Sequence, residues 1–191
     1  MKYLAACLGN IGPEYENTRH NVGFKVADAL AATADLSFSA CRYGSIAELH
    51  HKGRKIILLK PSTYMNLSGK AVSYWLQAEK IPLERLLVVL DDINLSFGRL
   101  RMRAGGGDGG HNGLKSIVQT LESENYARLR CGVGNSFGQG QQIDFVLGEW
   151  TDDERKLLPE CLDRAAEAVK SFATIGIERA MNVVNTSAKK N

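Results

Sequence analysis

The sequence predicts a single α/β domain over residues 1–191, built on a mixed sheet with parallel strands at its centre and helices on both faces. Apolar runs of strand length alternate with segments whose apolar residues recur at helical spacing. The continuously apolar run at 86–90 ends at Asp91, which is typical of a strand buried on both faces of a parallel sheet. A chain of 191 residues, 44% hydrophobic and 24% charged, also has the size and composition of one globular domain, which excludes a mainly disordered protein.

Hydrophobic periodicity predicts the individual elements. A short apolar run indicates a strand at 3–8, and helical spacing indicates a helix at about 21–34, for which Asn21 is a candidate N-cap. Strands at 46–51 and 55–60, separated by Gly53, form a hairpin, and a second helix surrounds 71–76. Alternation predicts strands at 99–103 and 127–133, each with arginines on one face. Helices at about 114–121, 152–172 and 176–185 complete the fold.

Composition also restricts the location of the protein. No run of ~18 apolar residues exists, so we expect no membrane segment. The first residues turn polar too soon for a secretory signal, and we therefore expect a cytoplasmic protein. The sequence contains no heptad pattern and no large apolar stripe, so we expect a monomer. The cysteines lack C-x-x-C spacing and fit reduced core residues rather than a disulfide or zinc framework: Cys7, Cys41, Cys131 and Cys161.

Four polar clusters, at 9–20, 61–69, 91–94 and 105–112, each follow a predicted strand. Ligands of open α/β sheets bind beyond the carboxyl ends of the strands, so the clusters converge on one site if several of these strands are parallel. His20 is a candidate general base, and Asp91 is the carboxylate best placed to orient it. The alternatives are a polar cap or loop residue for His20 and a helix cap or solvated strand end for Asp91. The adjacent Asp92 would point to the other face of the strand.

The sequence indicates neither a metal nor a covalent nucleophile. His50 and His51 are neighbours on a strand and point to opposite faces, while His20 and His111 lack H-x-x-x-H or H-x-H spacing. No G-x-S-x-G elbow is present, and no cysteine stands beside a histidine in a known motif. We therefore expect no metal and no cofactor. If the protein is a hydrolase, water activated by a base is the remaining nucleophile.

The middle of the chain predicts a ligand with negative charge. The glycine-rich run at 105–113 offers backbone N–H groups beside a helix N-terminus, which suits phosphate, although a flexible connection is the alternative. It is not a P-loop, because no G-K-[ST] follows. Neighbouring basic residues favour a polyanion over a merely solvated face: Arg99, Arg101, Arg103, Lys115, Arg128 and Arg130. Asn10, Asn66 and Asn112 add neutral donors and acceptors that can hold ester or amide groups.

Six segments together resemble the bacterial peptidyl-tRNA hydrolase family: LGNIGPEYENTRHNVGF (8–24), KPSTYMNLSGKAV (60–72), DDINLSFG (91–98), GGGDGGHNGLKSI (105–117), RLRCGVG (128–134) and DFVLGEW (144–150). The resemblance covers nearly the whole chain. It implies a single α/β domain with a twisted mixed sheet. It also implies hydrolysis of the ester that joins a peptide to the tRNA 3′ end, which recycles tRNA released from stalled ribosomes.

The resemblance also implies roles for individual residues. His20 matches the catalytic base and Asp91 the acid that supports its basic form. Asn10 matches the residue linked to distinguishing N-blocked peptidyl-tRNA from free aminoacyl-tRNA. The remaining matches are substrate-binding positions at Tyr15, Tyr64, Asn66 and Asn112, a peptide-side pocket position at Met65, and basic groups for the acceptor-stem phosphates at Arg101, Arg103 and Arg130.

The chain departs from the family pattern in its loops. Ile11 replaces a proline, Asn94 and Ser96 interrupt an L-D-L-P-x-G stretch, and Asn135 and Ser136 replace Arg-Pro. These changes touch loop rigidity and tRNA contact and leave the proposed chemistry intact. A non-enzymatic RNA-binding relative of plant organelles is a rival, which the intact base, acid and asparagines and the lack of a transit extension disfavour. A small-nucleotide phosphohydrolase is a further alternative, but it would need a metal-binding carboxylate cluster.

Overall fold

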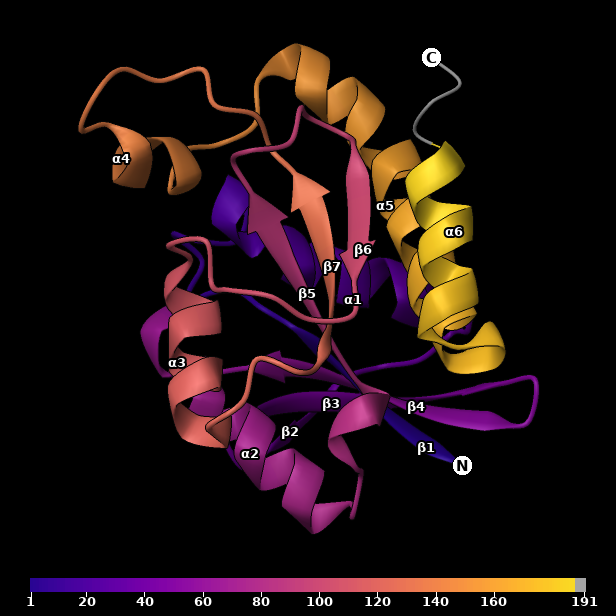
Figure 1. The fold of residues 1–191 in the computed structure, drawn as a ribbon. Coiled ribbons are helices and arrows are strands. Elements are labelled where there is room, and N and C mark those ends of the chain that lie inside the picture. Colours follow the sequence, from indigo (N-terminus) through magenta and orange to yellow (C-terminus); the bar gives the residue numbers. More distant parts are fainter. Residues whose placement is uncertain (188–191) are drawn as a thin grey trace.

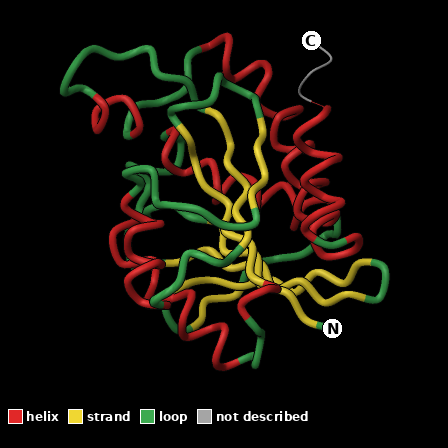
Figure 2. Tube along the Cα trace, in the orientation of Figure 1, coloured by secondary structure: helices red, strands yellow, loops and turns green. Residues whose placement is uncertain are grey.

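The computed structural model describes residues 1–187, which form one seven-stranded sheet with helices on both faces (Figures 1 and 2). The strands are β1 (Lys2–Cys7), β2 (Ser39–Cys41), β3 (Gly44–His51), β4 (Arg54–Pro61), β5 (Leu86–Asp92), β6 (Leu100–Arg103) and β7 (Ala127–Gly132). The α-helices are α1 (Val22–Thr33), α2 (Ser68–Ala78), α3 (Asn112–Leu121), α4 (Gln142–Val146), α5 (Asp152–Ile175) and α6 (Ile177–Ser187).

The sheet is mixed and has parallel strands at its centre, as the sequence predicts. Its order is β2-β3-β4-β1-β5-β7-β6. Strands β4, β1, β5 and β7 run parallel, while β2, β3 and β6 join by antiparallel pairing. The residues of the apolar run 86–90 are fully buried in β5. Lys52 and Gly53, with φ of 47° and 74°, form the left-handed two-residue turn that closes the β3–β4 hairpin.

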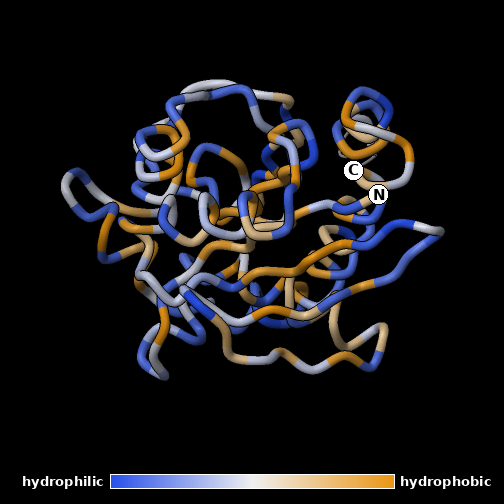
Figure 3. The backbone as a smooth tube through the Cα atoms, turned by 90° about the horizontal axis from the view of Figure 1, so that it is seen from below, coloured by the Kyte–Doolittle hydropathy of each residue, from blue (hydrophilic) through white to orange (hydrophobic). Residues whose placement is uncertain are grey.

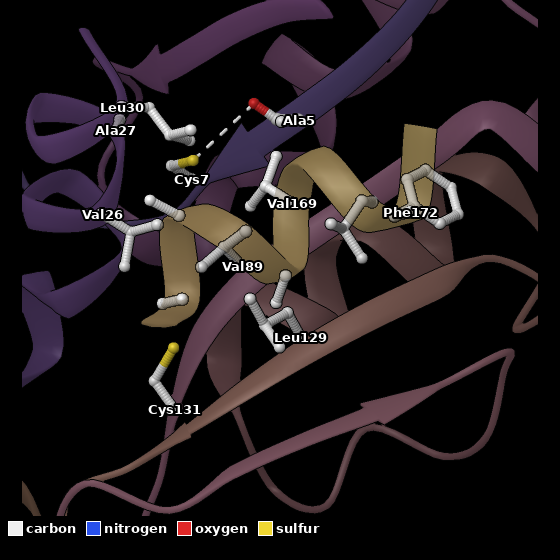
Figure 4. Packing of buried hydrophobic residues seen from close by; sticks show 14 of the residues in the cluster. Ala5, Cys7, Val26, Ala27, Leu30, Val89, Leu129, Cys131, Val169 and Phe172 are labelled. Carbon is white, nitrogen blue, oxygen red and sulfur yellow. Dashed lines mark hydrogen bonds between the residues drawn. The ribbon is translucent and has the colours of Figure 1, made fainter. Parts of the chain in front are cut away.

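Two apolar cores separate the sheet from its helices. Helices α1, α5 and α6 cover one face and α2 and α3 the other (Figure 1). Successive residues of β1 enter opposite cores: Ala6 packs towards α2 and α3, and Cys7 towards α1 and α5. Figure 4 shows the first core, where Val89 and Leu129 meet side chains of α1 and α5. In Figure 3, seen from below, long hydrophobic stretches run through the strands between the helices.

Every strand and helix expected from the sequence is present, with ends that differ by a few residues. The sequence missed β2 and α4, which are three and five residues long and carry too little periodicity to predict. Cys7 and Cys131 are buried as expected, but Cys41 and Cys161 are only half-buried. No helix within residues 1–187 combines the length and apolarity that crossing a membrane requires.

Three sequence expectations about polar residues change once the fold is known. Asn21 occupies the N-cap position of α1, but its side chain makes no capping bond. Arg128 does not share a solvated or ligand-facing surface with Arg130, because its side chain is completely buried. The cluster at 105–112 follows β6, which is antiparallel to its neighbour and ends at the opposite edge of the sheet from the other three clusters. The loop at 104–111 runs back to reach them, as Figure 1 shows between β6 and α3.

Candidate active site

A cleft of about 380 Å³ lies at the carboxyl edge of the parallel strands. The segments that follow β1, β4 and β5 meet there, and the returning glycine loop and α4 complete its walls. The structure therefore brings together nine of the eleven residues singled out above: Asn10, Tyr15, His20, Tyr64, Met65, Asn66, Asp91, Asn112 and Arg130. The other two, Arg101 and Arg103, lie outside the cleft on β6.

Asp91 stands between two imidazoles at the base of this cleft. Its side chain is 3% exposed, and each of its carboxylate oxygens contacts one histidine. Oδ2 lies 2.8 Å from Nδ1 of His20, and Oδ1 lies 2.7 Å from Nε2 of His111. The two rings are 5.1 Å apart between centroids. Asp91, His20 and His111 thus form a hydrogen-bonded triad, which supports the choice of Asp91 over Asp92 as the partner of His20.

The hydrogen bonds assign the ring protons of the triad. The backbone N–H of Gly113 donates to Nδ1 of His111 at 3.0 Å, so that nitrogen carries no proton. Nε2 of His111 must therefore hold the proton and donate it to Asp91. Nδ1 of His20 likewise donates to the carboxylate. The opposite nitrogen of His20, Nε2, is left unprotonated in the neutral ring and can accept a proton.

The electrostatics favour a basic His20. Burial lowers the pKa of His20, but the charge and hydrogen bond of Asp91 outweigh it, so this pKa is raised above its ordinary value. Burial alone would raise the pKa of Asp91, whereas His111 and His20, which both place a ring nitrogen against the carboxyl, hold that pKa well below its usual range. Asp91 is therefore ionised beside His20.

The packing of α1 puts His20 in reach of Asp91. His20 lies in a short 3-10 helix, Arg19–Asn21, immediately before α1. Gly23 lets the first turn of α1 press against the sheet, since a Cβ there would clash with the carbonyl oxygens of Leu8 and Val89. Val89 is in β5, the strand that carries Asp91.

Asn10 is held rigidly beside the triad by the residue that the sequence had suggested as a cap. Oδ1 of Asn21 accepts the backbone N–H of Asn10 at 2.8 Å, and Nδ2 of Asn21 donates to the Asn10 carbonyl at 2.9 Å. The side-chain Oδ1 of Asn10 accepts the backbone N–H of Met65 at 2.7 Å. The Nδ2 group of Asn10 is therefore the part of the side chain left to contact a ligand.

The triad also has the composition of a metal-binding group. One ligand atom each from His20, Asp91 and His111 lie within 4.8 Å of one another, so they could reach a single cation. Metal ligation requires deprotonated nitrogens. Nε2 of His111 holds its proton, because Gly113 donates to the other ring nitrogen. The donor set thus fits a hydrogen-bonded triad better than a metal site.

Comparison with known proteins decides the family. Residues 4–191 match the family model described as peptidyl-tRNA hydrolase. The chain belongs to the peptidyl-tRNA hydrolase family. Curated relatives with that name are 59% identical over 186 residues in Cytophaga hutchinsonii and 57% identical over 185 residues in Phocaeicola vulgatus, and each match covers 97% of this chain and 99% of the relative. The crystal structure of peptidyl-tRNA hydrolase from Acinetobacter baumannii matches with a TM-score of 0.89 and 34% identity, over 96% of this chain and 94% of that one.

The arginines that match basic positions of the peptidyl-tRNA hydrolase family lie in register on β6 and β7. Arg101 pairs with Arg130 and Arg103 with Arg128, so all four side chains leave the same face of the sheet. Arg130 reaches the cleft, where its Nη1 lies 3.8 Å from Oδ2 of Asp92. Across the described chain, neither Arg101 nor Arg103 takes part in an ion pair. These two basic groups are therefore available to a polyanion.

Sequence reasoning missed the contribution of His111 to the site of this peptidyl-tRNA hydrolase family member. The sequence pattern presents His111 only as a possible metal ligand, and its spacing from His20 fits no metal motif. A usable signal was its position at the end of a glycine-rich run and directly before a predicted helix, where a side chain can be aimed at a ligand. Gln142, Ile143 and Val146 of α4 and the following Leu147, which wall the cleft, gave no comparable signal.

Proposed function

We propose that the protein cleaves the ester bond between a peptide and the 3′-terminal ribose of tRNA, using a water molecule activated by His20. Family membership supports the substrate. The observation that carries the chemistry is the 2.8 Å bond from Nδ1 of His20 to the buried Asp91, which leaves Nε2 as a base at the cleft. Because ribosomes make peptidyl-tRNA, the proposal also places the activity in the cytoplasm.

The reaction needs only one base and water. Nε2 of His20 removes a proton from water while the water oxygen bonds to the ester carbonyl carbon. The tetrahedral intermediate then collapses, the bond to the ribose oxygen breaks, and the imidazolium returns its proton to that oxygen. Asp91 remains ionised throughout and stabilises the imidazolium, as the low pKa of its carboxyl allows. The products are a peptide carboxylic acid and a free tRNA 3′ end.

The asparagines supply neutral polar contacts around the ester. The Nδ2 group of Asn10 donates to the substrate, because its Oδ1 is already bonded to Met65. Asn66 and Asn112 are exposed on the cleft wall, where their amides can bind the peptide backbone or stabilise the oxyanion. Met65, 4% exposed, provides an apolar surface on the peptide side, and Tyr15 and Tyr64 offer ring faces at the opening.

The basic residues of β6 and β7 would hold the acceptor stem. Arg130 lines the cleft, Arg101 pairs with it across the two strands, and Arg103 lies two residues farther along β6. The row therefore leads away from the cleft along one face. Phosphates of the acceptor stem could follow this row while the 3′ end enters the cleft.

The test compares hydrolysis of N-acetyl-aminoacyl-tRNA with that of the unblocked aminoacyl-tRNA. We expect release of tRNA from the blocked substrate, and a fall in rate of at least ~100-fold for His20→Ala, the usual scale for loss of a general base. His50→Ala, at an exposed position of β3, is the matched control and should keep the wild-type rate. Retention of more than about a third of the activity by His20→Ala would contradict the assignment. Binding of tRNA without hydrolysis by the wild type would favour the non-enzymatic rival.

A further inference from the structure

The loop at 104–111, which joins β6 to α3, carries His111 into the cleft. Five of its eight residues are glycines, and three of these, Gly106, Gly109 and Gly110, have φ of 130°, 59° and 82°. Such a segment loses much conformational freedom when it is ordered, so its position depends on contacts from outside.

Arg128 supplies the shortest such contact to the middle of the loop. Its Nη1 donates to the Gly107 carbonyl at 2.9 Å, and its Nη2 donates to the Glu124 carbonyl at 3.0 Å. Gly107 precedes α3 and Glu124 follows it, so one guanidinium joins the two segments that flank this helix. Arg130 adds a longer bond of 3.3 Å to the Gly107 carbonyl from a more exposed position.

The cost of burying the Arg128 charge indicates that its function is to bind the carbonyls of Gly107 and Glu124. The side chain is completely buried, and its charge faces backbone carbonyls and the Tyr126 ring, 4.5 Å from the guanidinium carbon. Within residues 1–187 no carboxylate forms an ion pair with it, and its Nε has no hydrogen-bond partner. A buried cation without a counter-charge is costly, and an apolar side chain of similar length would avoid that cost.

Hydrogen bonds connect Gly107 to the triad over a few residues. Asp108, the next residue, accepts the backbone N–H of Gly110 through Oδ1 at 2.8 Å and that of His111 through its carbonyl at 3.0 Å. This compact turn ends at His111, whose Nε2 donates to Asp91. A displacement of Gly107 would therefore move His111 relative to the carboxylate.

We infer that Arg128 is a positioning residue for ester hydrolysis: it fixes the glycine loop through Gly107 and so holds His111 against Asp91. The inference rests on the proposed function for its effect on catalysis. Without the bond from His111, the Asp91 carboxylate would direct its full acceptor strength to His20. The imidazolium of His20 would become more stable and its pKa would rise further, so that a smaller fraction of His20 would be the unprotonated base that the reaction needs.

The test uses Arg128→Met, which keeps the length of the side chain and removes its charge and donors. We expect a folded protein with a kcat at least ~10-fold lower, a KM changed by less than ~3-fold, and a His20 imidazole that titrates at higher pH by NMR. His111→Ala should shift this titration in the same direction. Arg85→Met, at the amino end of β5 and away from the cleft, is the control and should change neither quantity.

A double-mutant cycle separates positioning from general damage. If Arg128 acts through His111, Arg128→Met should lower kcat by less than ~2-fold in a His111→Ala background. A merely structural role would reduce activity without moving the titration of His20. The other ionisable groups that line the cleft around His20 are unchanged in every variant: Tyr15, Tyr64, Asp91, Asp92, Asp108 and Arg130.

Three results would overturn the inference: a folded Arg128→Met with wild-type kcat, an unmoved His20 titration, or losses that simply add in the double mutant. Should the Met variant not fold, Arg128→Lys decides, because one ammonium group cannot reproduce the planar fork that bonds both carbonyls. Arg128→Lys should lower kcat and raise the His20 pKa. Wild-type values for both quantities would contradict the positioning role of Arg128. A wild-type protein that cleaves no ester would refute the proposed function, while the NMR titration would still report on Arg128.

Discussion

Replacement of Asp91 by asparagine tests the proton assignment of the whole triad. The substitution keeps the shape of the side chain but exchanges one acceptor oxygen for an NH₂ donor. In the wild type both imidazoles donate to Asp91. In the variant one of them must therefore face the new NH₂ donor. His111 cannot easily move its proton from Nε2 to Nδ1, because its Nδ1 accepts the backbone N–H of Gly113. His20 must therefore move its proton from Nδ1 to Nε2, and the base is lost.

The magnitude follows from this tautomer change. The same substitution in a Ser-His-Asp triad lowers kcat by about 10⁴-fold for the same reason. We expect a fall of at least ~10³-fold here, equivalent to about 4 kcal/mol of transition-state stabilisation. Stability should change far less, because the asparagine keeps a hydrogen-bonding atom for each ring and leaves no buried charge unpaired.

The assay is single-turnover release of tRNA from N-acetyl-aminoacyl-tRNA, with Asp92→Asn as the matched control. Asp92 accepts the backbone N–H of Asn94 at 2.8 Å and lies 3.8 Å from Arg130, without contact to either imidazole of the triad. Its amide variant should lose no more than ~3-fold. An Asp91→Asn enzyme that keeps more than about a tenth of the wild-type rate would refute the tautomer argument. A larger loss in Asp92→Asn than in Asp91→Asn would show that the wrong carboxylate was chosen.

Two further predictions concern tRNA affinity and stability. Replacing Arg101 and Arg103 by alanine should weaken tRNA binding and raise KM more than it lowers kcat. The slope of log affinity against log salt concentration should become shallower by one to two units, because each phosphate contact contributes roughly 0.7–0.9. An unchanged slope in salt titrations would mean that the tRNA docks elsewhere. Because the pKa of His20 is raised by folding, its contribution to stability is present below the unfolded pKa of ~6.5 and is lost as pH rises through the higher folded pKa. Urea unfolding at about pH 6 and pH 8.5 should show this loss in the wild type but not in His20→Ala, and equal losses in both proteins would argue against the Asp91 contact.

Local patterns in the sequence were sufficient for the architecture. The run at 86–90 predicted a central strand because a strand buries five successive apolar residues only when both of its faces are covered. Since β1, β4 and β5 are parallel, the polar residues that follow them had to meet at one edge of the sheet. This is why the polar clusters after these strands were expected to converge if the strands are parallel, whereas the place of Met65 came from the family resemblance.

Contacts made by chain reversals and by burial needed the tertiary structure. His111 reaches Asp91 only because β6 runs antiparallel and a glycine loop returns across the sheet, and no local pattern encodes that path. Arg128 and Arg130 alternate identically in sequence, but one is enclosed by the loop and Tyr126 and the other lines the cleft. Asn21 has the sequence position of a helix cap, yet its amide bonds to Asn10. Periodicity determines which face of an element a side chain leaves, whereas its partner depends on segments that are distant in the chain and meet only in the folded protein.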